Sequence, residues 1–125
     1  DFRLQTCQLL YRFSTESPLT TQEQISGLTA LYPITITNLG DTDSYTVEIE
    51  ENIWDTEATI IPTLNYLDMA TFWVQVHIPS GLPTGAYDQV TVTITSNNDP
   101  TQFEEIPITT TAIENHPVFL PGIWK

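Results

Sequence analysis

Apolar and polar residues alternate along most of this 125-residue chain, and this period of two constrains the fold more than any other feature. The alternation is clearest over residues 32–37, 45–50, 72–78 and 90–95. No window has apolar residues at the i, i+3, i+4 and i+7 spacing of an amphipathic helix. Because Thr, Val and Ile dominate the alternating segments and favour strands, the sequence predicts an all-β domain.

The turns and prolines between these segments predict about seven short strands. Strands of this length and spacing are typical of an immunoglobulin-like antiparallel β-sandwich, whose alternate apolar residues face inward between two sheets. We expect the sandwich over residues 31–113, with an apolar tail over 114–125. Residues 1–30 are predicted to form a strand and then, over 14–26, a long loop, and this head either docks on its own domain or is donated to a neighbour. Pro107 places the last strand at a sheet edge or at a bulge.

Charge excludes several classes of function. The chain has 16 acidic and 3 basic residues, a net charge of -13, and its basic residues are only Arg3, Arg12 and Lys125. Such a chain repels nucleic acid and anionic lipid, and no apolar run is long enough to be inserted into a membrane. The single cysteine, Cys7, cannot form a disulfide within the chain. Abundant Thr and a single Lys favour an extracellular or cell-surface protein.

Few residues are available for catalysis. Only His77 and His116 titrate near neutral pH, and neither stands in a known catalytic motif. His77 is predicted to lie on the outer face of a sheet, since its neighbours Val76 and Ile78 belong to the inward set. Cys7 lies among apolar alternates and is predicted to be a small buried hydrophobe. We therefore expect no enzyme activity and no required cofactor.

Asp41 and Asp43 form the one candidate metal site, for Ca²⁺. They stand at i and i+2 in a turn, and Asn97, Asn98 and Asp99 supply further oxygens. Calcium needs six to eight oxygen ligands, and Asp and Asn also occupy β-turns for their own local hydrogen bonds. Both interpretations stay open from the sequence.

The candidate interaction residues are apolar. Trp73 should point outward if Phe72 and Val74 point inward, so it is available to stack on a sugar or pack on a protein, unless a terminal segment of the chain covers it. Both ends are too apolar to be expected free in solution, and they either dock on this domain or add as strands to other copies. The end residues with this role are Phe2, Leu4, Val118, Phe119, Leu120, Ile123 and Trp124.

Three stretches resemble the immunoglobulin-like and fibronectin-type-III-like accessory repeats of bacterial secreted proteins. They read YPITITNLGDTDSY over residues 32–45, ATFWVQVHIPSGLPTG over 70–85 and VTVTITSNNDP over 90–100. The usual Gly-rich turn of these repeats is replaced by NYLD at residues 65–68. Residues 116–125, HPVFLPGIWK, resemble the short C-terminal "YLP" tail of exported Chloroflexi-type proteins, which implies export and the true end of a polypeptide.

Three roles follow as expectations. The resemblance favours a C-terminal accessory module of an extracellular bacterial protein, while the apolar ends favour a subunit of a surface filament, joined by strand addition to protein partners that include other copies of itself. The alternative is a carbohydrate-binding module that uses exposed aromatic residues such as Trp73.

Overall fold

A computed structural model describes residues 10–115, which form eight β-strands and no helix. None of the described residues therefore forms a helix that could span a membrane. The strands are β1 (Phe13–Glu16), β2 (Thr21–Ile25), β3 (Thr29–Asn38), β4 (Tyr45–Glu50), β5 (Asp55–Ala58), β6 (Met69–His77), β7 (Tyr87–Ser96) and β8 (Phe103–Ile113).

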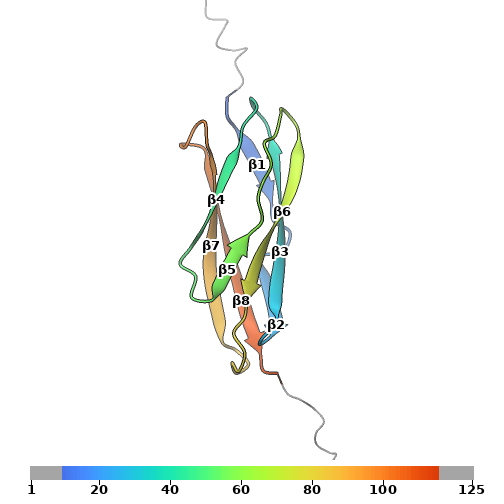
Figure 1. Cartoon of the computed structure of the whole chain (residues 1–125), viewed down its shortest axis with the longest axis vertical. Coiled ribbons are helices and arrows are strands. Elements are labelled where there is room, and N and C mark those ends of the chain that lie inside the picture. Colours follow the sequence, from blue (N-terminus) through green and yellow to red (C-terminus); the bar gives the residue numbers. More distant parts are fainter. Residues whose placement is uncertain (1–9, 116–125) are drawn as a thin grey trace, which may run out of the picture.

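Two four-stranded sheets lie face to face, with strand orders β1-β3-β6-β5 and β2-β8-β7-β4 (Figure 1). This is the immunoglobulin arrangement of strands, with its first strand divided between the two sheets. The prediction of an all-β, immunoglobulin-like sandwich is confirmed, with eight strands instead of about seven. One pair, β2 with β8, is parallel, whereas all other strand pairs between residues 10 and 115 are antiparallel.

The core follows the alternation of the sequence. Every second residue of β3, and of β6 from Phe72 onward, is fully or almost fully buried between the sheets, as the pattern predicts. The largest apolar side chains that are fully buried are Tyr32, Ile34, Ile36, Phe72, Val74, Val76, Val92, Ile94 and Ile108. Their removal from water is the main term that stabilises the fold.

The predicted loop over residues 14–26 is wrong, because this segment carries most of β1 and all of β2. Both strands lie at sheet edges, where Ser, Thr and Gln alternate between half-buried and exposed positions, so they lack an apolar period. The predicted strand before residue 14 is described only in part, since residues 1–9, with Cys7, lie outside the described range. In the same way, residues 116–125, with His116, lie outside it.

The prediction from Pro107 that the last strand lies at a sheet edge is wrong for β8 as a whole, which lies between β2 and β7, but Pro107 itself is at a position where β8 has a neighbour on one side alone. It pairs with Thr91 of β7, but β2 begins to pair with β8 only at Thr109. An N–H at residue 107 would point to the side of β8 on which β2 lies. Because β2 does not extend to this position in the described fold, no strand there needs that N–H, and proline is tolerated.

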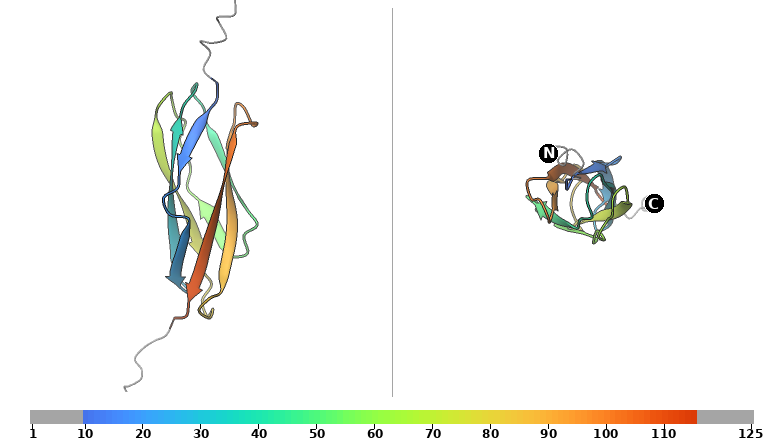
Figure 2. Two further views of the ribbon diagram at one scale, coloured as in Figure 1. Left: turned by 180° about the vertical axis from the view of Figure 1, so that it is seen from behind. Right: turned by 90° about the horizontal axis from the view of Figure 1, so that it is seen from above.

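The two flanks of the sandwich differ. On one flank the chain itself passes from β1 in one sheet to β2 in the other, which joins the two edges (Figure 2). On the other flank β4 and β5 are edges of different sheets. The described chain begins at one end of the long axis, at Leu10, and finishes at the opposite end, at Asn115 (Figure 1).

Candidate functional site

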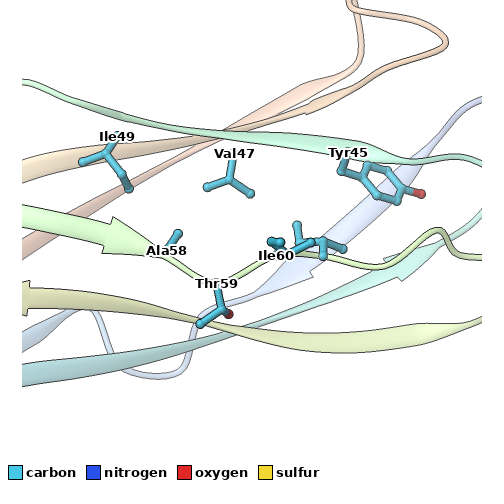
Figure 3. Close-up of a pocket in the computed structure, with 7 residues that line it drawn as sticks. Tyr45, Val47, Ile49, Ala58, Thr59 and Ile60 are labelled. Carbon is cyan, nitrogen blue, oxygen red and sulfur yellow. The ribbon is translucent and has the colours of Figure 1, made fainter.

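An apolar slot opens between β4 and β5, on the flank where two sheet edges face each other. Its volume is about 210 Å³. Val47 and Ile49 point from β4 toward the segment that contains Ala58 and Ile60 (Figure 3). The complete lining is Tyr45, Val47, Ile49, Ala58, Thr59, Ile60 and Ile61. The slot thus leads from solvent toward the hydrophobic core, and side chains of another segment can enter it.

The backbone of β4 offers hydrogen bonds along this slot. The N–H of Asn97 donates to the carbonyl of Ser44 at 3.0 Å, and Tyr45 stands opposite Ser96. Because bonded and non-bonded pairs alternate in an antiparallel ladder, Thr46, Glu48 and Glu50 bond to β7. The N–H and C=O groups of the residues between them, Tyr45, Val47 and Ile49, therefore point to the free edge. A strand added there would meet both apolar side chains and unused backbone groups.

Tyr45 closes one end of the slot. Its ring packs edge-on against Phe13 of β1, with centroids 5.2 Å apart, and only 8% of the residue is exposed. Its hydroxyl is buried and has no hydrogen-bond partner among residues 10–115. Burial, helped by the charge of Asp43, raises the pKa of Tyr45 to about 12. A buried hydroxyl without a partner costs folding free energy, so this position is suboptimal in the isolated domain.

Asp88 fixes the other end of the slot. This buried carboxylate accepts hydrogen bonds from the backbone N–H groups of Ile53 and Trp54, both at 2.9 Å. The turn that it holds begins at Glu51, whose φ of 67° is in the left-handed region. The Asp88 carboxylate therefore holds the turn by which the chain leaves β4 and starts β5, the strands on either side of the slot.

Carboxylates surround the slot, and of these only Glu57 has a basic partner among the described residues. Glu48 and Glu50 project from the outer face of β4, Glu51 follows them, and Asp55 and Glu57 project from β5, all exposed. Between residues 10 and 115 the only Lys or Arg is Arg12. The one ion pair of the described chain joins Glu57 to His77. The rim is thus strongly negative and favours a segment that carries a positive charge.

The opposite flank is joined by side-chain hydrogen bonds. The hydroxyl of Tyr32, on β3, donates to the carbonyl of Thr109 at 3.0 Å and lies 2.7 Å from the hydroxyl of Thr110, both on β8 of the other sheet. The side-chain amide of Gln22, on β2, donates to the carbonyl of Leu31. Burial raises the pKa of Tyr32, while its hydrogen bond to Thr110 opposes that shift. The Tyr32 hydroxyl on this flank therefore has partners, and the opening of this flank, about 390 Å³ in volume, is lined by Glu16, Ser17 and Pro18 of the link between β1 and β2 and not by a row of apolar side chains.

Trp73 lies where the alternation predicts it. It is 42% exposed on the outer face of the β1-β3-β6-β5 sheet, opposite Pro33 of β3, and Leu31 lies diagonally across from it and is 46% exposed. No described segment covers these residues completely. They form a shallow apolar surface, which is a second position for an interaction.

Asp43 is buried and engaged by protein donors. Its carboxylate accepts hydrogen bonds from the Ser44 N–H at 2.8 Å, the Ser96 hydroxyl, and the side-chain amide of Asn98 at 2.8 Å. The backbone N–H of Asp41 donates to the Leu10 carbonyl. Among the described residues no group of three or more His, Cys, Asp or Glu side chains is arranged to hold a metal ion. The donors around Asp43 account for its burial, and calcium binding by Asp41 and Asp43 stays a prediction.

His77 lies on the outer face, between Thr29 and Glu57. Its Nδ1 is 2.9 Å from the Thr29 hydroxyl and its Nε2 is 2.8 Å from Oε2 of Glu57. A hydroxyl, an imidazole and a carboxylate in this order resemble the parts of a hydrolytic triad. Catalysis also needs a substrate pocket and oxyanion donors, and none of these three residues lines the slot. We interpret the row as cross-strand hydrogen bonding between β3, β6 and β5.

The predicted interaction residues at the two ends lie outside the described range, so the structure does not bring them together. They are Phe2, Leu4, Val118, Phe119, Leu120, Ile123 and Trp124. The slot was not predicted, because Val47 and Ile49 have the same alternating pattern as core residues. Only the strand order shows that β4 is an edge.

No protein-family model matches the chain, and no curated protein matches it at a significant level. Solved structures are similar in fold. A family 123 glycoside hydrolase from Clostridium perfringens matches over 82% of this chain with a TM-score of 0.65 and 7% identity. The secreted serine protease VesC from Vibrio cholerae matches over 92% with a TM-score of 0.54 and 14% identity.

In both enzymes the matched part is a minority of the protein, 27% of the hydrolase chain and 25% of the protease chain. An ASH/PapD-like domain of human CEP192 matches over 82% of this chain and 87% of its own length, with a TM-score of 0.51 and 12% identity. At these identities the likeness concerns the fold alone, and it supports the immunoglobulin-like sandwich.

Proposed function

We propose that this chain is a non-catalytic interaction domain of an extracellular bacterial protein, which binds other protein by strand addition at the edge of β4. The observation that carries the proposal is the slot between β4 and β5. There an apolar lining, a row of unused backbone groups and an unpartnered buried hydroxyl occur together. Strand addition uses the first two features, since the added backbone completes the ladder and alternate side chains fill the pockets.

Other observations support the extracellular and non-catalytic parts of the proposal. The acidic, Thr-rich composition with a single Lys is usual for secreted domains. A net charge of -13 keeps such modules soluble and limits side-by-side aggregation of their edges. The resemblance to bacterial accessory repeats favours a module of a larger protein, whereas the apolar segments at both ends favour a filament subunit.

The assembly state separates these two forms. We would measure it on the full chain by size-exclusion chromatography with light scattering and by negative-stain microscopy. Filaments or concentration-dependent oligomers are expected for a subunit, and a monomer that binds only a heterologous partner is expected for a module. A monomer with no affinity for its own segments or for any partner strand would contradict strand addition altogether.

Val47 provides a matched test of the edge. Val47→Pro removes an N–H that points to the free edge while the ladder with β7 keeps its bonds, and it should abolish association. Val47→Ala loses two methyl groups from the same position but keeps that N–H, so it should weaken association much less. Equal effects of the two variants would mean that the backbone edge is not used.

A carbohydrate-binding module is the second candidate, supported by the exposed pair of Trp73 and Leu31. Aromatic rings on a flat sheet face can stack on sugar rings. A glycan titration of the full chain, with Trp73→Ala as control, tests this function. Binding that disappears in the variant would favour it, and no affinity for any polysaccharide would exclude it.

A further inference from the structure

We infer that the slot between β4 and β5 is filled by residues 1–6 of a second copy of this chain, with Phe2 and Leu4 inserted and Arg3 directed to the acidic rim. The inference rests on the proposed function of strand addition and adds the identity of the donor segment. It follows from three properties of the described flank: its length, its pattern of side chains and its charge.

Length and pattern agree with this segment. β4 has six residues, about 20 Å of extended backbone at the usual rise per residue, and residues 1–6 are long enough to pair with all of it. In residues 1–6, DFRLQT, Phe2 and Leu4 are two positions apart and point to the same face of a strand. Val47 and Ile49 have the same spacing on β4 and line the slot. Phe2 and Leu4 can therefore stand opposite them.

The charged residues favour the same register, in which Phe2 and Leu4 stand opposite Val47 and Ile49. When Phe2 and Leu4 point inward, Arg3 points outward and stands opposite Glu48, whichever way the donor strand runs. The neighbours of Glu48 on the rim are Glu50 and Glu51, which have no basic partner among the described residues. Arg3 is one of only three basic residues in the chain. Its placement there would remove repulsion that the isolated domain retains.

The other apolar segment fits less well. Residues 117–124, PVFLPGIW, contain two prolines, which cannot donate to a ladder and which leave only three residues, 118–120, between them. Residues 1–9, DFRLQTCQL, contain no proline or glycine. The slot needs a donor with an uninterrupted backbone, so residues 1–6 are the better match.

The donor must come from another copy. β1 runs away from the end of the molecule at which Leu10 lies, so residues 1–9 of the same copy would have to reverse direction just before Leu10 to follow β4 (Figure 1). Residues 6–11, TCQLLY, contain no Gly, Pro, Asn, Asp or Ser, the residues that make tight reversals. The carbonyl of Leu10 is already held by the N–H of Asp41, and a Cβ at Gly40 would lie 1.5 Å from that carbonyl oxygen. The approach of the chain is therefore fixed at this point.

The direction of the donor strand decides the architecture. A donor parallel to β4 places two copies in the same orientation, and repetition of that contact gives an open chain of subunits. A donor antiparallel to β4 brings the two like ends together, and two copies can then exchange segments in a closed pair.

Disulfide trapping between copies distinguishes a donor strand that is parallel to β4 from one that is antiparallel. In a Cys7→Ser, Gln5→Cys background, residue 5 stands opposite residue 50 for a parallel donor and opposite residue 46 for an antiparallel one. Glu50→Cys or Thr46→Cys should therefore form an intermolecular disulfide, since the Cα atoms must be within about 7 Å. Glu23→Cys, on the exposed edge strand β2, is the matched control and should not cross-link. No cross-link at either β4 position, equal cross-linking at Glu23, or a disulfide within one chain would overturn the inference.

Two paired substitutions distinguish a failure of this inference from a failure of the proposed function, strand addition at the edge of β4. Phe2→Asp with Leu4→Asp, at positions outside the described fold, should weaken self-association of the full chain at least about tenfold, by loss of two buried apolar side chains. Phe119→Asp with Leu120→Asp should leave it unchanged. The reverse result would overturn the donor assignment while strand addition stands. An unmodified chain that stays monomeric at every concentration would remove this inference, and filament assembly with it.

Discussion

The two flanks of this sandwich each contain a buried tyrosine, and the two tyrosines have opposite environments. Tyr32 crosses from β3 to β8 and finds two partners there, Thr109 and Thr110. Tyr45, on β4, finds none among the described residues. The first flank is joined by the chain itself between β1 and β2, whereas the second leaves two edges unjoined. A domain that completes one flank and leaves the other incomplete is suited to completion by a further strand.

The largest change should come from Asp88→Ala, which would widen the open flank. Its carboxylate holds the backbone N–H groups of Ile53 and Trp54, and both would lose a charged acceptor. We expect the free energy of unfolding to fall by about 3 kcal/mol. Chemical denaturation measures it, and Trp54 fluorescence should shift to longer wavelength. Asp88→Asn keeps an acceptor oxygen and should lose less, and equal losses would mean that the turn does not depend on this contact.

Tyr32→Phe tests the completed flank. It removes the bonds to Thr109 and Thr110 and leaves the buried Thr110 hydroxyl without its partner. The free energy of unfolding should fall by about 1–2 kcal/mol in urea denaturation. An unchanged value would indicate that the flank is held by packing alone.

Alkaline pH should reveal the raised tyrosine pKa values. Burial raises the pKa of Tyr45 to about 12, and that of Tyr32 also rises. Below pH 10 the tyrosine hydroxyls are protonated in both the folded and the unfolded chain, so stability does not depend on their titration. Above pH 10 the tyrosines of the unfolded chain lose their protons first, which favours unfolding. Stability should therefore fall as the pH rises from 10 through about 12, with a loss on the order of 1 kcal/mol from Tyr45 at pH 11. Denaturation of Tyr45→Phe at pH 8 and pH 11 should show a smaller loss between the two.

The smallest effect, with the opposite sign, is expected for Tyr45→Phe at neutral pH. The variant removes a buried hydroxyl that has no partner in the described chain, so stability should stay the same or rise by about 1 kcal/mol. Thermal unfolding beside Tyr32→Phe measures the contrast directly. A loss of stability for both variants would show that the two flanks are equally complete.

Much of the sandwich follows from local sequence. In β3, β6, β7 and β8 the apolar period of two matches the buried face, and the exposure of Trp73 follows from its buried neighbours Phe72 and Val74. The apolar period does not predict β1 and β2, because edge strands bury few side chains and the residues of these two strands are mostly polar. These two strands depend on pairing with β3 and β8, and a local sequence pattern gives no information on pairing with distant strands.

The candidate site is less predictable for the same reason. Val47 and Ile49 look like core residues, and only the order of strands in the sheet makes them the wall of a slot. Asp43 gives an example in the opposite sense. Its position in an acidic turn suggested calcium, but the turn with Ser96 and Asn98, more than fifty residues later in the chain, supplies its donors. In both cases contacts between distant segments determine the surroundings of the residue, and calcium binding by Asp41 and Asp43 stays a prediction.

The parallel pairing of β2 with β8 gives the domain a mechanical property. The described chain begins and finishes at opposite ends of the long axis, so tension along the polypeptide pulls β2 and β8 in opposite directions (Figure 1). The bonds between residues 21–25 and 109–113 lie across that force and are loaded in shear. They must break together instead of opening one after another. A polypeptide under tension would therefore carry its load on this short ladder before the core is exposed.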